Sequence, residues 1–167
     1  MIRLAPNFTL RELVASQTAA RQGITNSAPW WAIENLTSLC TEVLQPIRDH
    51  YGRPVVVSSG FRSQALERVL KGMPADWVSH GQHPLGQAAD FEVLGLSNAD
   101  VARWIRANLA FDQLILEFHN TADPSSGWIH CSYVRPNRTE TLTAVRHHGD
   151  VTYQEGLPSL VTDPEIS

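Results

Sequence analysis

Long hydrophobic runs are absent from this sequence. No segment approaches the roughly 20 consecutive apolar residues that a membrane-spanning helix needs. The opening stretch turns polar at Arg11 and Glu12 before a secretory hydrophobic core has formed. We therefore expect a protein that is synthesised in the cytoplasm without a signal peptide and that has no membrane as its partner.

Basic residues are also in short supply. The chain has 13 Lys and Arg against 17 Asp and Glu, a formal charge of −4, whereas proteins that bind the nucleic-acid backbone rely on clustered Lys and Arg. Nucleic acid is therefore not expected as a partner. The same balance argues against electrostatic adhesion to an anionic membrane or cell wall, so any such attachment would need another module or protein.

Cysteine is limited to Cys40 and Cys131, which lie far apart in the sequence and have no CxxC spacing. This pattern disfavours both a structural disulfide and a zinc site built on cysteine. Because adjacent residues of a strand point to opposite faces, Cys131 turns away from any site that His130 faces.

The length of 167 residues is enough for one substantial core but short for two. We expect a monomer with a single domain over residues 1–135. Residues 136–167 are polar and contain Pro158 and Pro164. They are expected to form a C-terminal extension that is partly extended over the surface and then frayed.

Hydrophobic periodicity predicts an α+β fold, in which helices flank a central, mainly antiparallel sheet. Thr9 and Glu12 form a capping-box pattern that starts a short first helix. Longer helices are expected over residues 30–50, 63–71 and 98–108, and the first of them is expected to bend or break near Pro46. Strands are expected over residues 55–57, 88–93, 111–118 and 127–133, the first of them buried and the last two paired as a hairpin.

Residues 72–87 are rich in Gly, Pro, His and Ser and predict an ordered surface loop, where functional groups concentrate. His83 lies in this loop, and Gly86 permits a close turn toward Asp90 at the start of the next strand. With His130 from a different strand, these residues can converge on one ion, and zinc accepts both imidazole nitrogen and carboxylate oxygen. From spacing alone, it is more common for a histidine such as His83 to be a surface residue and for an aspartate such as Asp90 to cap a turn.

Four ordered motifs carry a family resemblance. Residues 79–91, SHGQHPLGQAADF, resemble the S-x-H-x-x-G-x-A-x-D signature of the zinc D-alanyl-D-alanine carboxypeptidase family. That family also contains L-alanyl-D-glutamate endopeptidases of phages and shares its fold with the Hedgehog signalling domain. The other three motifs are SSGFRS at residues 58–63, FDQLILE at residues 111–117 and WIH at residues 128–130. The resemblance covers roughly residues 8–135.

The resemblance implies that His83, Asp90 and His130 bind one zinc ion, and two His with one carboxylate suit that metal. It also implies a substrate-binding role for Arg62, whose guanidinium fork suits a carboxylate. An ordinary surface ion pair is the alternative for Arg62. His80 and His119 are further candidates as ligands or transition-state donors.

Two positions depart from the family pattern. The signature serine is replaced by Gly81, so its contact with substrate is absent or supplied by Gln82, whose alternative is a hydrogen bond within the loop. The general base of many relatives stands three residues before the last ligand, where this chain has Gly127. We expect Glu117, across the hairpin loop, to act as the base, with Asp123 in reserve and a purely structural Glu117 as the alternative.

The function implied is that of a zinc metallopeptidase that cuts the stem peptides of bacterial peptidoglycan. It would act as a D,D-carboxypeptidase or an L-alanyl-D-glutamate endopeptidase, resembling a phage endolysin that reaches the cell wall after release or as part of a virion. Because the expected base is displaced from the family position, a second function stays open, namely a zinc-stabilised binding or virion structural module without hydrolysis. A zinc amidase of another fold fits the ordered motifs less well.

Overall fold

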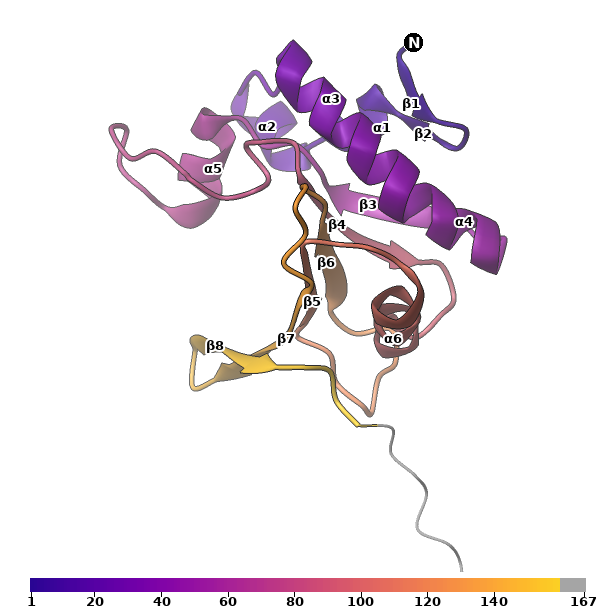
Figure 1. Ribbon diagram of the computed structural model, residues 1–167. Coiled ribbons are helices and arrows are strands. Elements are labelled where there is room, and N and C mark those ends of the chain that lie inside the picture. The colour runs from indigo at the N-terminus through magenta and orange to yellow at the C-terminus, as the bar shows by residue number, and fades with distance from the viewer. Residues whose placement is uncertain (160–167) are drawn as a thin grey trace, which may run out of the picture.

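The computed structural model describes residues 1–159 and has, within that range, a central sheet of six strands in the order β3-β4-β6-β5-β7-β8 (Figure 1). All neighbouring strands are antiparallel except β5 and β7, which are parallel. The expected α+β fold with a mainly antiparallel sheet is confirmed. The strands are β3 (Val55–Ser59), β4 (Ala88–Val93), β5 (Gln113–Glu117), β6 (Trp128–Ser132), β7 (Glu140–His147) and β8 (Asp150–Glu155).

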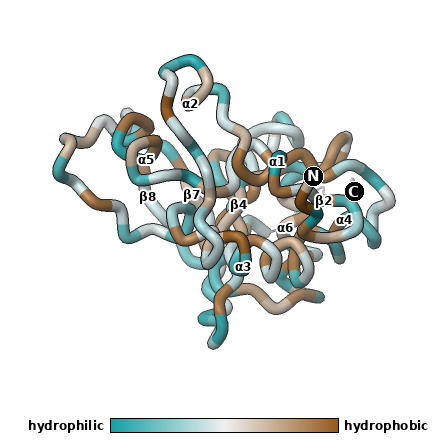
Figure 2. Tube along the Cα trace, turned by 90° about the horizontal axis from the view of Figure 1, so that it is seen from above, coloured by the Kyte–Doolittle hydropathy of each residue, from teal (hydrophilic) through white to brown (hydrophobic). Residues whose placement is uncertain are grey.

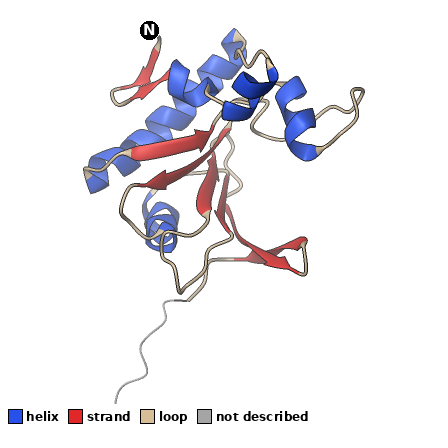
Figure 3. Ribbon diagram, turned by 180° about the vertical axis from the view of Figure 1, so that it is seen from behind, coloured by secondary structure: helices blue, strands red, loops and turns tan. Residues whose placement is uncertain are grey.

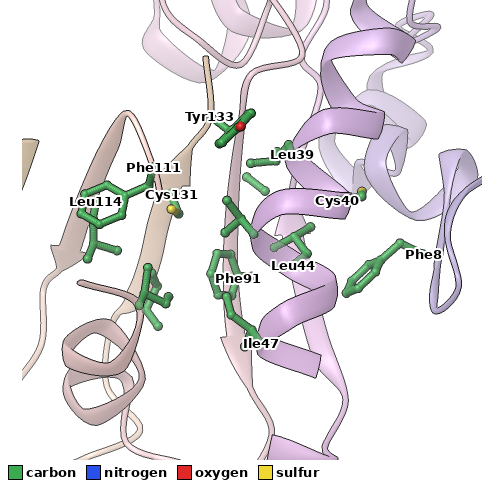
Figure 4. Packing of buried hydrophobic residues seen from close by; sticks show 14 of the residues in the cluster. Phe8, Leu39, Cys40, Leu44, Ile47, Phe91, Phe111, Leu114, Cys131 and Tyr133 are labelled. Carbon is green, nitrogen blue, oxygen red and sulfur yellow. The ribbon is translucent and has the colours of Figure 1, made fainter. Parts of the chain in front are cut away.

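Three helices pack on one side of this sheet. They are α3 (Trp30–Leu39), α4 (Gln45–Tyr51) and α6 (Asn98–Asn108), as Figure 1 shows. In the core between them and the sheet, Leu44 and Ile47 approach Phe91 of β4, and all three are fully buried (Figure 4). The helix α5 (Gln64–Lys71) lies on the other side of the sheet, and the β7–β8 end of the sheet projects toward that side (Figures 1 and 3).

The N-terminal segment adds two short helices and a small ribbon of strands. Thr9 caps α1 (Leu10–Val14), and its backbone N–H in turn donates to the Glu12 carboxylate at 2.8 Å, so the expected capping box is present. The helix α2 (Gln17–Gln22) was not expected from the sequence. The ribbon pairs β1 (Arg3–Ala5) with β2 (Phe8–Thr9).

The long helix predicted over residues 30–50 is interrupted, as expected, but the irregular part precedes Pro46. A π-helical turn, η1 (Cys40–Leu44), separates α3 from α4, and the Gln45 N–H donates to the Cys40 carbonyl five residues earlier. Proline has no N–H, and its ring clashes with the carbonyl four residues back in a regular helix. The extra residue of a π turn relieves that conflict, which explains the position of the interruption.

The edges of the sheet differ from the prediction. The valines of β3 were expected to be buried, but β3 is an edge strand and Val56 is 43% exposed. Strands β7 and β8 lie beyond residue 135, where the domain was expected to end, and β7 pairs with β5 over five residues. Residues 140–155 therefore continue the central sheet as β7, β8 and the turn between them. The expected fraying of residues 160–167 lies outside the described residues.

Hydrophobic residues occur in short stretches along the chain, interrupted by hydrophilic ones (Figure 2). Among residues 1–159, no helix is both long enough and apolar enough to cross a membrane.

Candidate metal centre and active site

The side of the sheet opposite α3, α4 and α6 bears a cavity of about 830 Å³. Strands β4, β5 and β6 contribute to its floor, and the loop that follows α5 contributes to its wall. The three expected metal ligands, Arg62 and Glu117 all line this cavity. The fold therefore gathers the main candidates of the sequence analysis in one place.

His83, Asp90 and His130 come together although they belong to three segments. Asp90 of β4 and His130 of β6 are direct cross-strand partners, so their side chains project from the same face of the sheet. The Oδ1 atom of Asp90 lies 3.3 Å from Nε2 of His83 and 2.9 Å from Nδ1 of His130. All three are buried, and one ligand atom from each lies within 4.8 Å of the others. Two imidazole nitrogens and one carboxylate oxygen form a donor set that fits zinc.

Backbone contacts orient His83. Its Nδ1–H donates to the Gly60 carbonyl at 2.7 Å, which leaves Nε2 free to face Asp90. The turn after His83 closes through Gly86, whose φ is +71° and whose N–H donates to the His83 carbonyl at 3.0 Å. A Cβ at Gly86 would lie 2.5 Å from the Ala32 carbonyl oxygen, so this turn packs directly on α3. The close turn expected at Gly86 is present.

Arg62 lies within the site. Its side chain is 17% exposed, and its Nη2 lies 2.5 Å from Oδ2 of Asp90. Its Nε donates to Ser59 Oγ at 2.7 Å and its Nη1 to Glu67 at 3.1 Å. Arg62 thus binds Oδ2 of Asp90 and leaves Oδ1 to the two imidazoles. Its contact with substrate stays a prediction.

The charges around Asp90 favour its ionised form. Burial alone would raise the pKa of the Asp90 carboxyl, but the charge of His83 and hydrogen bonds from His130 and His83 lower it well below its usual range. An anionic carboxylate is the form that binds a cation.

Glu67 was missed by sequence reasoning. Its carboxylate is 1% exposed and binds Arg62, the Lys71 ammonium at 2.9 Å and the Ser79 hydroxyl at 3.1 Å. The spacing of Glu67 and Lys71 was visible in the sequence, but an i, i+4 pair of opposite charge usually marks a solvated helix surface. Here the pair holds the arginine beside the metal ligands.

Glu117 ends β5 and projects from the same face as His130. Its neighbour two residues back, Ile115, is the direct partner of His130, and residues two apart on a strand share a face. Burial and the negative charge of Asp90 raise the pKa of Glu117, against the opposing charges of His130 and Arg62. Glu117 is therefore a carboxylate of increased basicity in the same cavity as the expected metal ligands.

The backbone at Gly127 has no space for the glutamate that is the general base of many relatives at this position. Its φ is +68°, and a Cβ there would lie 1.9 Å from the Glu117 backbone oxygen. A glutamate cannot be accommodated in this backbone conformation without displacing β5. Asp123, the reserve candidate, lies in the loop between β5 and β6, where it accepts hydrogen bonds from the backbone and hydroxyl of Ser125.

Gln82 and His80 line the cavity. The Gln82 amide donates to the Asp112 carboxylate at 2.8 Å, a bond to a residue outside the loop rather than the bond within the loop considered from the sequence, and the contact of Gln82 with substrate stays a prediction. Asp112 is 1% exposed and also binds the Arg138 guanidinium. Nothing in the sequence pointed to this pair. His119 is partly buried beyond the end of β5, and its Nδ1 has no hydrogen-bond partner among the described residues.

A protein-family model described as peptidase M15 matches residues 6–132, which include all three expected metal ligands, Arg62 and Glu117. A comparison with curated proteins found no match.

Proposed function

Because the chain belongs to the peptidase M15 family, whose members depend on zinc, we propose that it hydrolyses peptide bonds in the stem peptides of bacterial peptidoglycan. The observation that carries this proposal is that the buried cluster of His83, Asp90 and His130 lines the same cavity as Glu117. The bond cut is that of a D,D-carboxypeptidase or of an L-alanyl-D-glutamate endopeptidase.

The residues divide the chemistry between them. His83, Asp90 and His130 would hold a zinc ion, which when bound would supply Lewis acidity toward a carbonyl group and water. Glu117 takes a proton from the attacking water and delivers it to the leaving amine. Burial and the charge of Asp90, which raise the pKa of Glu117, make its carboxylate a stronger base for taking that proton.

Arg62 has donors left for substrate. A guanidinium carries five N–H groups, and Ser59, Glu67 and Asp90 take one each. The remaining N–H groups can bind a carboxylate or carbonyl oxygen of the peptide. Because its other bonds fix the guanidinium in place, little side-chain entropy remains to be lost when substrate binds.

We also propose that the enzyme resembles a phage endolysin in its setting, works as a monomer and reaches the wall after release or on a virion. A binding module without hydrolysis was suggested by the displaced base. The position of Glu117 in the cavity now favours the peptidase.

The test is incubation with purified peptidoglycan, with zinc or with chelator, followed by identification of the new termini by mass spectrometry. Glu117→Gln is expected to lower kcat by about 10²–10⁴-fold while zinc stays near one per chain. The exposed Glu92 on β4 provides the control variant Glu92→Gln, which should keep full activity. His83→Ala should lose the metal. If no fragments are released at any zinc concentration, the proposal is wrong.

A further inference from the structure

The hairpin of β7 and β8 reaches the cavity although it lies beyond the residues that the family model matches. Tyr153 of β8 lines the cavity together with the metal ligands and Glu117, and Pro136 and Arg138 line it from the segment that leads into β7. Figures 1 and 3 show the hairpin and the α5 segment projecting from the same side of the sheet. The cavity thus has one wall from the matched part of the chain and another from the hairpin.

The strand register places Tyr153 in line with Glu117. Trp128, Glu117, Ala144 and Tyr153 are successive direct partners across β6, β5, β7 and β8. Directly paired residues project from the same face of a sheet. Ala144, between Glu117 and Tyr153, has only a methyl group, so no bulky side chain separates the phenol from the cavity.

The base of the hairpin is fixed to the loop that carries His83. Arg138 binds the Asp112 carboxylate through Nη2 at 2.7 Å and Nε at 3.0 Å, and Gln82 donates to the same carboxylate. The Glu140 N–H donates to the Asp112 carbonyl at 3.0 Å. The position of β8 relative to the expected metal ligands is therefore set by a charged contact between the buried Asp112 and the 56% exposed Arg138 rather than by a free loop.

Tyr153 has the properties of a group that contacts substrate. Its side chain is 57% exposed, and its hydroxyl makes no hydrogen bond to the residues that the structure describes. Partial burial and the negative charge of Glu117 raise the pKa of the phenol, so it stays protonated and can donate a hydrogen bond at neutral pH. An exposed aromatic ring with a polar tip suits contact with a peptide.

We propose that Tyr153 is a specificity-determining residue, whose hydroxyl donates a hydrogen bond to an oxygen of the peptide substrate while its ring supports the peptide chain. This inference rests on the proposed peptidase function. It assigns part of the substrate contact to a hairpin outside the matched range.

The experiment compares Tyr153→Phe, Tyr153→Ala and the control Gln154→Ala, which changes the next residue, also exposed, on the opposite face of β8. Steady-state kinetics are measured on a soluble stem pentapeptide with zinc-loaded protein. Tyr153→Phe should raise KM by about 5-fold through the loss of one hydrogen bond. Tyr153→Ala should raise it by roughly 10- to 100-fold through the further loss of ring contact. The melting temperature and the acidic limb of the pH profile should not move.

Binding gives a second measurement. The same substitutions in a Glu117→Gln background should weaken pentapeptide binding by the same factors, measured by calorimetry. If wild-type protein cleaves the peptide and Tyr153→Ala behaves within twofold of Gln154→Ala, the inference alone is overturned. A loss confined to kcat with a shifted pH profile would also overturn it, because Tyr153 would then act through Glu117. If wild-type protein neither cleaves nor binds any stem peptide, the proposed function fails and the inference fails with it.

Discussion

Replacing Glu67 by glutamine removes one negative charge from the buried contacts behind the metal ligands and keeps the size of the side chain. Glu67 is 1% exposed and binds Arg62 at 3.1 Å and Lys71 at 2.9 Å. The bond to Arg62, itself 17% exposed, is worth about 1.5–3 kcal/mol. Lys71 is 47% exposed, so solvent screening reduces the contribution of its bond to about 0–1 kcal/mol. The free energy of unfolding should fall by about 1.5–4 kcal/mol at neutral pH.

The same substitution has a defined pH dependence. Burial alone would raise the pKa of Glu67, but hydrogen bonds from Lys71 and Arg62 hold it below its ordinary value of 4.5. A carboxyl whose pKa is lower in the folded state stabilises the protein above its unfolded-state pKa and loses that effect as the pH falls through the folded value. The free energies of unfolding of wild type and Glu67→Gln should therefore differ by the full amount at pH 7 and become more similar in acid.

The assay is urea unfolding of zinc-free protein, followed by tryptophan fluorescence at a series of pH values. Lys71→Met is the matched control, because it removes only the exposed partner and should cost no more than about 1 kcal/mol. A Glu67→Gln protein within about 0.5 kcal/mol of wild type at pH 7 would refute the reasoning. A difference that persists undiminished in acid would refute it equally.

Three further predictions concern the site. Burial and the charge of Asp90 raise the pKa of Glu117 in protein without zinc, so its carboxyl should titrate above the ordinary value of 4.5; NMR titration of zinc-free protein, with Glu117→Gln to assign the signal, measures this. Gly127→Ala should lower the free energy of unfolding by more than about 3 kcal/mol in a thermal melt, because its Cβ would lie 1.9 Å from a backbone oxygen. Gly149→Ala, also at positive φ but with nothing within 4 Å of its Cβ, should lower it by only about 1–2 kcal/mol. Zinc at about 100 times its Kd should stabilise the protein by about 2.7 kcal/mol relative to chelated protein, and His83→Ala should abolish that difference in a melting experiment.

The ordered motifs of the family resemblance, rather than spacing alone, singled out the candidate site, and the structure brings its residues together. His83 and Asp90 lie seven residues apart, and a loop followed by a strand brings them together. The alternation of side chains along a strand correctly placed Cys131 in the core, away from His130. Glu117 was found because a hairpin loop can fold out and leave its two strands paired.

The contacts that could not be predicted are those between distant segments. Every residue of β8 is exposed, so the hydrophobic alternation that reveals a half-buried strand was absent. The parallel pairing of β5 with β7 joins residues far apart in the chain and leaves no local pattern. The contact between Asp112 and Arg138 depends on that pairing, so it was hidden for the same reason.

The parallel pairing of β5 and β7 sets a lower limit on the piece of chain that can carry the proposed active site. A protein cut at the end of the matched range would turn β5 into an edge strand, and the backbone groups that now bond to β7 would be open to other chains. It would also bury the Asp112 carboxylate without its arginine. Glu117, the residue expected to act as the base, would then lie on an edge strand of the sheet. Any segment chosen for transplanting this catalytic unit into another protein should therefore extend through Glu155.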